Sequence, residues 1–235
     1  MKRLLLPALL LTTLTACTAA PADTLPAAVP TPTPTSTPAP TAAPTPADAL
    51  TPEEKIGQLF IIRPDALDLT LPQETINDAK ADGVTMLTDA MRETLQAYPV
   101  GGICQFGKNI TDPEQLAQFN ADLQAASRTP LFIAVDEEGG AVARLANHPA
   151  FDLPQYESAA AVGASGDPAD ACAMGQTIGA YLKEYGFNMD FAPDADVNTN
   201  PDNPIIGTRA FSSDAATAAE MAAAAADGLR TGGIL

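Results

Sequence analysis

Acidic and basic side chains are concentrated where one apolar run of the sequence ends. Residues 131–145 read L-F-I-A-V-D-E-E-G-G-A-V-A-R-L, so a run typical of a buried strand leads directly into Asp136. Asp136 would then lie at the carboxyl end of a strand, where barrel enzymes place their active sites. Paired glycines allow a tight turn, and Arg144, eight residues after Asp136, can return to the same pocket as a second polar anchor. The alternative is that these acids only cap the next helix.

Two later segments repeat this pattern of an apolar run followed by a polar loop. Residues 187–197 read F-N-M-D-F-A-P-D-A-D-V, and residues 203–211 read N-P-I-I-G-T-R-A-F. Arg209 lies in a loop shaped by glycine and proline, where its planar guanidinium can present a fixed fork of donors to a ligand oxygen. The simpler alternative is a salt bridge between Arg209 and a neighbouring acid such as Asp194 or Asp196.

The elements that would position these residues alternate between helices and strands. Thr51, followed by a proline and two glutamates, is typical of a helix start, and Ile56, Leu59 and Phe60 then form an apolar face at helical spacing. Strands are predicted over 100–106, 131–135 and 188–192, and helices over 112–126, 167–185 and 213–230. The alternation implies right-handed crossovers and a parallel sheet of an α/β protein, either open and doubly wound or closed as a barrel.

The overall charge restricts the partners that this chain can bind. A formal charge of -17 repels nucleic acid and anionic membrane surfaces, so no nucleic-acid partner is expected and a neutral or cationic ligand is favoured. The acidic balance alternatively serves only solubility. Three cysteines are too few for a disulfide framework or a metal cluster. We therefore predict no metal site, and we expect Cys104 and Cys172 to be buried thiols unless they are bridged outside the cell.

The amino-terminal residues have the features of a secretion signal. Residues 1–16 combine Lys2 and Arg3 with an apolar run over 4–11 and small residues before a cleavage position. Their end, L-T-A followed by Cys17, resembles the lipobox of bacterial lipoproteins, in which the cysteine thiol receives a diacylglyceryl group. We therefore predict lipidation of Cys17 and an extracytoplasmic protein anchored to the bacterial cell membrane by lipid. An ordinary signal with an incidental cysteine is the alternative.

A linker separates this signal from the folded part. Residues 17–48 contain nine prolines with many threonines and alanines, and they cannot bury a core. An extended proline-rich chain rises about 3.1 Å per residue, so this segment would hold a domain up to roughly 90 Å from the bilayer. The predicted plan is a signal peptide over 1–16, a disordered linker over 17–48, and one folded domain over 49–235.

The motifs together resemble the catalytic barrel of glycoside hydrolase family 3. They are K-I-G-Q-L-F at 55–60, V-G-G-I at 100–103, D-E-E-G-G-A-V-A-R-L at 136–145, F-A-P-D-A-D-V at 191–197 and N-P-I-I-G-T-R-A-F at 203–211. The D-x-E-G-G-x-V-x-R pattern resembles the corresponding motif of the β-N-acetylglucosaminidase branch of this family. The resemblance implies a (β/α)8 barrel and a retaining β-N-acetylhexosaminidase that needs no cofactor and acts on N-acetylglucosamine-containing carbohydrate or peptidoglycan. It also implies that Asp136, Arg144 and Arg209 bind hydroxyls of the terminal sugar.

The same resemblance implies that this chain carries no catalytic residue. A Lys-His sugar-contact pair, the histidine and aspartate of the acid/base and the aspartate nucleophile would all lie beyond Leu235, so the barrel is expected to be truncated to roughly its first half. His148 falls outside these motifs and is expected in a surface loop. A retaining glycosidase needs a nucleophilic carboxylate and a proton donor about 5 to 5.5 Å apart, so we expect the chain alone to be inactive.

Two other classes of protein fit part of the sequence. A solute-binding lipoprotein would also combine a lipobox, a linker and an α/β body, although it would not carry the D-E-E-G-G motif. A non-catalytic sugar-binding remnant of a glycosidase would keep the sugar contacts and lose the reaction.

Overall fold

The computed structural model describes residues 46–235. The predicted signal peptide, the lipidation site Cys17 and nearly all of the predicted linker lie outside this range. The first described element, η1 (Pro46–Ala49), crosses the predicted boundary between linker and domain. Within residues 46–235, none of the helices combines the length and apolar composition needed to cross a membrane.

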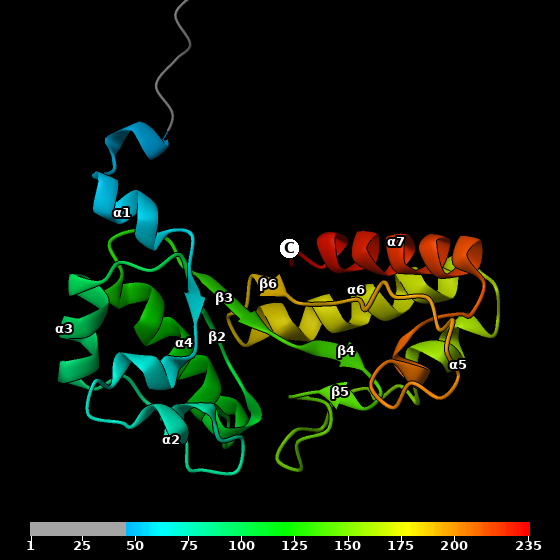
Figure 1. Ribbon diagram of the computed structural model, residues 1–235, viewed down its shortest axis with the longest axis horizontal. Coiled ribbons are helices and arrows are strands. Elements are labelled where there is room, and N and C mark those ends of the chain that lie inside the picture. The colour runs from blue at the N-terminus through cyan, green and yellow to red at the C-terminus, as the bar shows by residue number, and fades with distance from the viewer. Residues whose placement is uncertain (1–45) are drawn as a thin grey trace, which may run out of the picture. The chain divides into compact units, whose positions relative to one another are not determined.

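A parallel sheet of four strands forms the centre of the fold (Figure 1). Its strands are β1 (Ile61–Ile62), β2 (Gly102–Cys104), β3 (Phe132–Val135) and β6 (Met189–Asp190). The three predicted strands are confirmed, with fewer residues than predicted. Their order in space is β1-β2-β3-β6, which follows the chain without reversal. A doubly wound sheet reverses its strand order at a switch point, so this sequential order is that of a barrel.

Helices follow most of the strands, and a hairpin is inserted after β3. The α-helices are α1 (Pro52–Gly57), α2 (Gln73–Asn77), α3 (Asp89–Ala97), α4 (Pro113–Ala126), α5 (Ala159–Gly163), α6 (Pro168–Glu184) and α7 (Ala215–Thr231). Short 3-10 turns are η2 (Pro64–Leu67), η3 (Gly107–Asn109) and η4 (Gly207–Arg209), and the hairpin consists of β4 (Glu137–Gly139) and β5 (Val142–Ala143). Figure 1 shows α3 and α4 at one end of the sheet and α6 and α7 at the other.

The helix ends confirm the local predictions from sequence. Thr51 and Glu54 form the predicted capping box, in which the hydroxyl and the carboxylate each accept the other residue's backbone N–H. Asp112 caps α4 through the N–H of Gln115. Gly186 follows α6 with φ at 83°, a left-handed conformation that favours glycine. These residues define where the helices begin or end.

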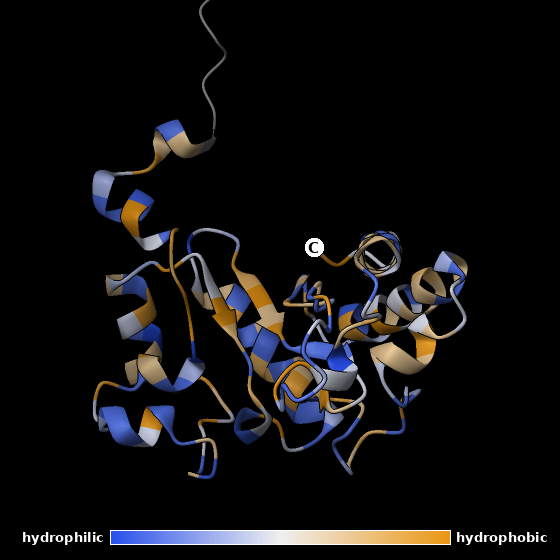
Figure 2. Ribbon diagram, turned by 45° about the vertical axis from the view of Figure 1, so that its right-hand side comes forward, coloured by the Kyte–Doolittle hydropathy of each residue, from blue (hydrophilic) through white to orange (hydrophobic). Residues whose placement is uncertain are grey.

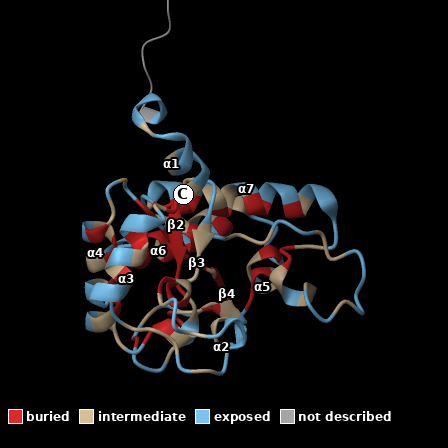
Figure 3. Ribbon diagram, turned by 60° about the vertical axis from the view of Figure 1, so that its left-hand side comes forward, coloured by how far each residue is buried: buried red, intermediate tan, exposed pale blue. Residues whose placement is uncertain are grey.

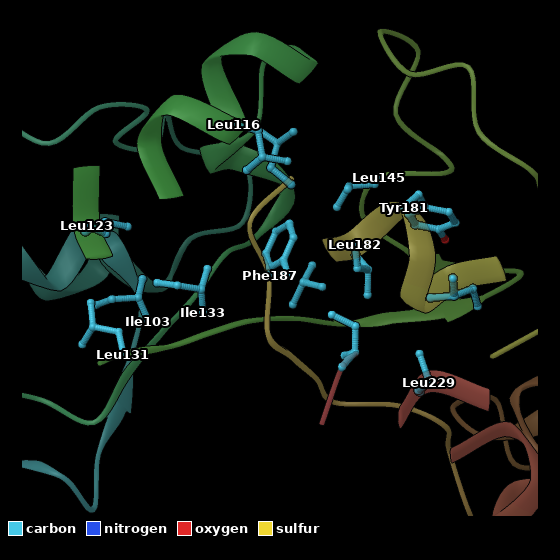
Figure 4. Packing of buried hydrophobic residues seen from close by; sticks show 14 of the residues in the cluster. Ile103, Leu116, Leu123, Leu131, Ile133, Leu145, Tyr181, Leu182, Phe187 and Leu229 are labelled. Atoms are coloured by element: carbon cyan, nitrogen blue, oxygen red, sulfur yellow. The ribbon is translucent and has the colours of Figure 1, made fainter. Parts of the chain in front are cut away.

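The core lies between the sheet and its flanking helices. Ile103 of β2 and Ile133 of β3 are fully buried and belong to one apolar cluster with leucines of α4 and α6 (Figure 4). Figure 3 shows the buried parts of the sheet and of these helices. Apolar burial of this kind contributes about 25 cal/mol per Å². Cys104 is buried in this region and Cys172 is half-buried on α6, and both thiols are free, so the alternative of a bridge is wrong.

The predicted apolar face of α1 is present, but it is not part of the core. Ile56, Leu59 and Phe60 are 58%, 81% and 55% exposed, and α1 has no buried residue. Figure 2 shows this hydrophobic colouring on a helix that projects from the body of the domain. The helical spacing of the apolar residues therefore predicted the helix correctly, but it did not predict whether other elements pack against the apolar face.

Close packing of α6 against α7 supplies a test of the fold. A Cβ added at Gly175 of α6 would lie 2.1 Å from the carbonyl oxygen of Ala225, whereas one added at Gly107 would meet nothing within 4 Å. We expect Gly175→Ala to lower the free energy of unfolding by about 1 to 3 kcal/mol, because backbone cannot yield as a side chain does. Gly107→Ala is the matched control in urea denaturation. Equal midpoints for the two variants would contradict the observed helix contact.

Candidate sugar-binding site

The carboxyl ends of the parallel strands bring polar residues from distant parts of the sequence to one edge. Arg63 follows β1, Gln105 follows β2, Asp136 follows β3, and Asp190 is the last residue of β6. Active sites of barrel enzymes are built at this edge from the residues that follow each strand. The predicted position of Asp136 at a strand end is therefore confirmed.

Arg144 returns to Asp136, as its spacing predicted, and the two side chains form an ion pair. Nη2 of Arg144 donates to Oδ2 of Asp136 at 2.9 Å, and both side chains are half-buried. Gly139 and Gly140 have φ of 82° and 66°, so the turn that returns Arg144 to Asp136 uses a conformation that favours glycine. The alternative that these acids cap the next helix is wrong, because Ser158 caps α5.

Arg209 is held by two acids, Glu138 of β4 and Asp194 of the loop after β6. Its Nε and Nη2 donate to the two carboxylate oxygens of Glu138 at 2.8 and 2.7 Å, and Nη2 lies 3.3 Å from Oδ2 of Asp194. The alternative of a salt bridge to Asp194 is therefore present, beside a stronger bidentate pair with Glu138. The hydrogen bonds to Glu138 raise the pKa of Arg209. The guanidinium is thus fixed in orientation before any ligand binds.

Asp190 lies behind this group of charges with one oxygen unpartnered. It is 6% exposed, its Oδ1 accepts the backbone N–H of Glu137 at 3.0 Å, and its Oδ2 has no hydrogen-bond partner among the described residues. Burial raises the pKa of this carboxyl well above its ordinary value, and the nearby charges of Glu137 and Asp136 add to the effect. Asp190 therefore favours the protonated form.

A cavity of about 330 Å³ opens beside the Asp136–Arg144 pair. Arg63, Phe106 and Arg144 line it, and the guanidinium carbon of Arg63 lies 4.3 Å from the centre of the Phe106 ring. Lys108 also lines the cavity, but its ammonium group donates to the carbonyl oxygens of Thr75, Ile76 and Asp78. Sequence reasoning missed Arg63 and Phe106, although Arg63 directly follows the apolar residues 59–62 and had the same strand-end signal as Asp136.

Comparison with known sequences decides the family. The sequence profile of the glycosyl hydrolase family 3 N-terminal domain matches residues 51–235. The chain belongs to glycoside hydrolase family 3. The sequential parallel sheet agrees with the α/β fold of the TIM-barrel type that this family's N-terminal domain has.

Relatives of this family 3 chain include proteins named as hexosaminidases. Beta-hexosaminidase A of Pseudoalteromonas piscicida is 32% identical over 157 residues, which cover 65% of this chain and 26% of that protein. Beta-hexosaminidase LpqI of Mycobacterium tuberculosis is 32% identical over 181 residues, which cover 71% of this chain and 42% of that protein. The structure of a family 3 β-N-acetylglucosaminidase from a Paenibacillus species matches with a TM-score of 0.64 at 33% identity and covers 79% of this chain and 32% of its own. The chain spans less than half the length of each of these proteins.

Two further features of the family 3 domain concern other kinds of chemistry. No group of three or more histidine, cysteine, aspartate or glutamate side chains within residues 46–235 is arranged to hold a metal ion. His148 is half-buried in a turn, where its Nδ1 accepts the N–H of Ala150 at 3.3 Å and its ring packs edge-on against Phe151. The predicted loop position of His148 is confirmed, although its side chain is half-buried and not fully exposed.

The raised pKa of Asp190 predicts a pH-dependent loss of stability. The folded state keeps this proton at pH values where an aspartate of the unfolded chain has already released it, so the free energy of unfolding falls as the pH rises through that interval. We expect Asp190→Asn, which does not titrate and keeps the acceptor for Glu137, to gain stability relative to the unmodified chain between pH 4 and pH 7. Urea denaturation at both values measures the change.

Asp202→Asn provides the control for this measurement, because Asp202 is exposed. Its stability relative to the unmodified chain should be the same at both pH values. If the stability of Asp190→Asn relative to the unmodified chain were also the same at both pH values, the assignment of a protonated buried carboxyl would be contradicted.

Proposed function

We propose that this chain forms the sugar-binding wall of a retaining β-N-acetylhexosaminidase, which hydrolyses terminal β-linked N-acetylhexosamine residues of carbohydrate or peptidoglycan. The observation that carries the proposal is the Asp136–Arg144 pair, which lies at the carboxyl edge of the parallel sheet in a family 3 domain. The relatives named as hexosaminidases, and the structure named as a β-N-acetylglucosaminidase, support the substrate class.

The paired charges of the site are suited to hydroxyl groups. Arg144 occupies Oδ2 of Asp136, which leaves Oδ1 without a partner among residues 46–235 and able to accept from a sugar hydroxyl. Arg209 has its Nε and Nη2 on Glu138, so its Nη1 edge, which also lies 3.3 Å from the carbonyl oxygen of Ile205, is the part that would donate to a sugar. An ion pair prepared in this way binds a polar neutral ligand at little cost of reorganisation.

The acids of the site are committed to other partners, which supports placing the acid/base and the nucleophile outside the described residues. Asp136 pairs with Arg144, Glu138 pairs with Arg209, Glu137 accepts backbone N–H groups, and Asp190 is buried. A retaining mechanism requires one ionised carboxylate free to attack the sugar and one acid free to protonate the leaving group. This occupancy also favours the second candidate function, in which the chain binds sugar without hydrolysing it.

Hydrolysis and binding by the 235-residue chain test the placement of the catalytic groups. We expect the chain to bind N-acetylglucosamine and to release no p-nitrophenol from p-nitrophenyl N-acetyl-β-D-glucosaminide, because Asp136 and Glu138 are each paired with an arginine and the site offers no second carboxyl free to protonate the leaving group. Release with multiple turnovers would contradict the placement of the catalytic groups, while leaving the hexosaminidase assignment intact.

Loss of the proposed sugar contacts should weaken binding without unfolding the protein. A charge-assisted hydrogen bond is worth about 1.5 to 3 kcal/mol, so Asp136→Ala and Arg209→Ala should each raise the Kd for N-acetylglucosamine by about 10 to 200-fold. Calorimetric titration measures the Kd, and thermal melting checks the fold. Glu157→Ala, in an exposed loop, is the control. Unchanged Kd values for both site variants at unchanged Tm would remove the support for these contacts.

The localisation is a separate proposal, which rests on the sequence of residues 1–17. We propose that a diacylglyceryl group on Cys17 anchors the protein outside the cytoplasm, since two or more acyl chains give stable membrane attachment. Cells expressing the full chain should incorporate labelled palmitate into it, and Cys17→Ala should abolish the label and move the protein to the soluble fraction. Label on the Cys17→Ala variant would contradict the proposal.

A further inference from the structure

Two buried carboxyl groups hold the backbone that follows each member of the Asp136–Arg144 pair. Glu137 is fully buried, and its carboxylate accepts the N–H of Leu145 at 2.8 Å and the N–H of Ala146 at 2.9 Å. Asp190 accepts the N–H of Glu137. The peptide group after Asp136 and the peptide group after Arg144 are therefore both fixed by side chains from beneath the site.

We infer that Glu137 is the positioning residue of the sugar site, whose carboxylate holds Arg144 against Asp136 in the geometry that receives the sugar. This inference rests on the proposed function, because the geometry matters only if the pair binds a sugar. Glu137 acts through Arg144 and need not contact the ligand itself.

The backbone of the hairpin is too short to set this geometry alone. The pairing of β4 with β5 consists of Glu137 opposite Ala143 and Gly139 opposite Val142, with an irregular register between them, and it ends before Arg144. Side-chain amides also tie this segment: Asn147 donates to the carbonyl of Gly140, and Gln155 donates to that of Ala146. The carbonyl of Leu145 accepts the N–H of His148 at 2.9 Å, a bond that lies beyond the peptide group that follows Arg144. The side chain of Leu145 is buried in the core, but that burial does not by itself orient the preceding peptide group.

A third donor completes the environment of Glu137. The hydroxyl of Tyr181, on α6, donates to Oε1 at 2.8 Å, and Figure 4 shows this side chain beside Leu145. Burial and the charge of Glu137 raise the pKa of Tyr181, so its hydroxyl stays protonated as a donor. Among the described residues no cation pairs with Glu137, and its charge is balanced by these three donors. The hydroxyl of Tyr181 donates to Glu137 and has no hydrogen bond to Arg144 or to the N–H of Leu145 among the described residues, which makes Tyr181 a suitable control.

Two conservative variants separate positioning from stability. Glu137→Gln replaces one acceptor oxygen by an amide nitrogen, so the N–H of either Leu145 or Ala146 faces another donor and loses its hydrogen bond. We expect its Kd for N-acetylglucosamine to rise about tenfold or more. Tyr181→Phe lowers the Tm but keeps both backbone contacts, so its Kd should change by less than about threefold. If the rise in Kd were proportional to the loss in Tm in both variants, the inference would be overturned.

A double-mutant cycle with Arg144→Ala tests whether Glu137 acts through Arg144. In the Arg144→Ala background, Glu137→Gln should still lower the Tm but should not raise the Kd further. Fully additive effects on Kd would overturn the inference. Should Glu137→Gln fail to fold, Glu137→Asp keeps the charge, withdraws it from the N–H of Leu145, and is expected to raise the Kd in the same way.

A crystal structure of the Glu137 variant makes the two possible failures distinguishable. We expect the contact between Nη2 of Arg144 and Oδ2 of Asp136 to be lost or displaced. An intact contact in the variant would overturn the inference even if the unmodified chain binds sugar. Absence of N-acetylglucosamine binding by the unmodified chain would instead defeat the proposed function, and the crystal structure would still decide whether Glu137 positions Arg144.

Discussion

The arrangement of the site depends on the burial of one carboxylate that, among the described residues, has no cation beside it. Removing a charge from water costs several kcal/mol unless hydrogen bonds replace the lost hydration. Glu137 obtains these bonds from two peptide groups beyond the hairpin and from Tyr181 on α6, while its own N–H is bound by Asp190 of β6. A strand, a hairpin and a helix that are distant in sequence are therefore joined at one side chain.

The charges above this carboxylate are arranged in pairs. Arg144 neutralises Asp136, and Arg209 is held between Glu138 and Asp194. In a chain with a net charge of -17, two guanidinium groups thus compensate most of the charge of the three carboxylates beside them. Fixed pairs of this kind offer both donors and acceptors to a ligand, which suits the alternating hydroxyl groups of a sugar better than a single charge does.

Local signals predicted the features that depend on neighbouring residues. The capping residues Thr51 and Asp112, the glycine turn and the return of Arg144 to Asp136 all follow from spacing along the chain. Features that depend on packing between distant segments were not predicted. The stacking of Arg63 on Phe106 joins two strand ends, and the exposure of the α1 face depends on what lies against it. The spacing of apolar residues along the chain predicts neither the stacking of Arg63 on Phe106 nor the exposure of the α1 face.

The three consecutive acids show why composition alone could not assign their roles. Side chains alternate between the two faces of an extended chain, so Asp136 and Glu138 point one way and Glu137 points the other. The first and third residues accordingly meet Arg144 and Arg209, whereas the second enters the interior and binds Tyr181. A shift of one residue in the register of this extended segment would exchange the faces of the interior acid and the arginine-paired acids. The register of β3 therefore decides which of three similar carboxylates is able to face a sugar.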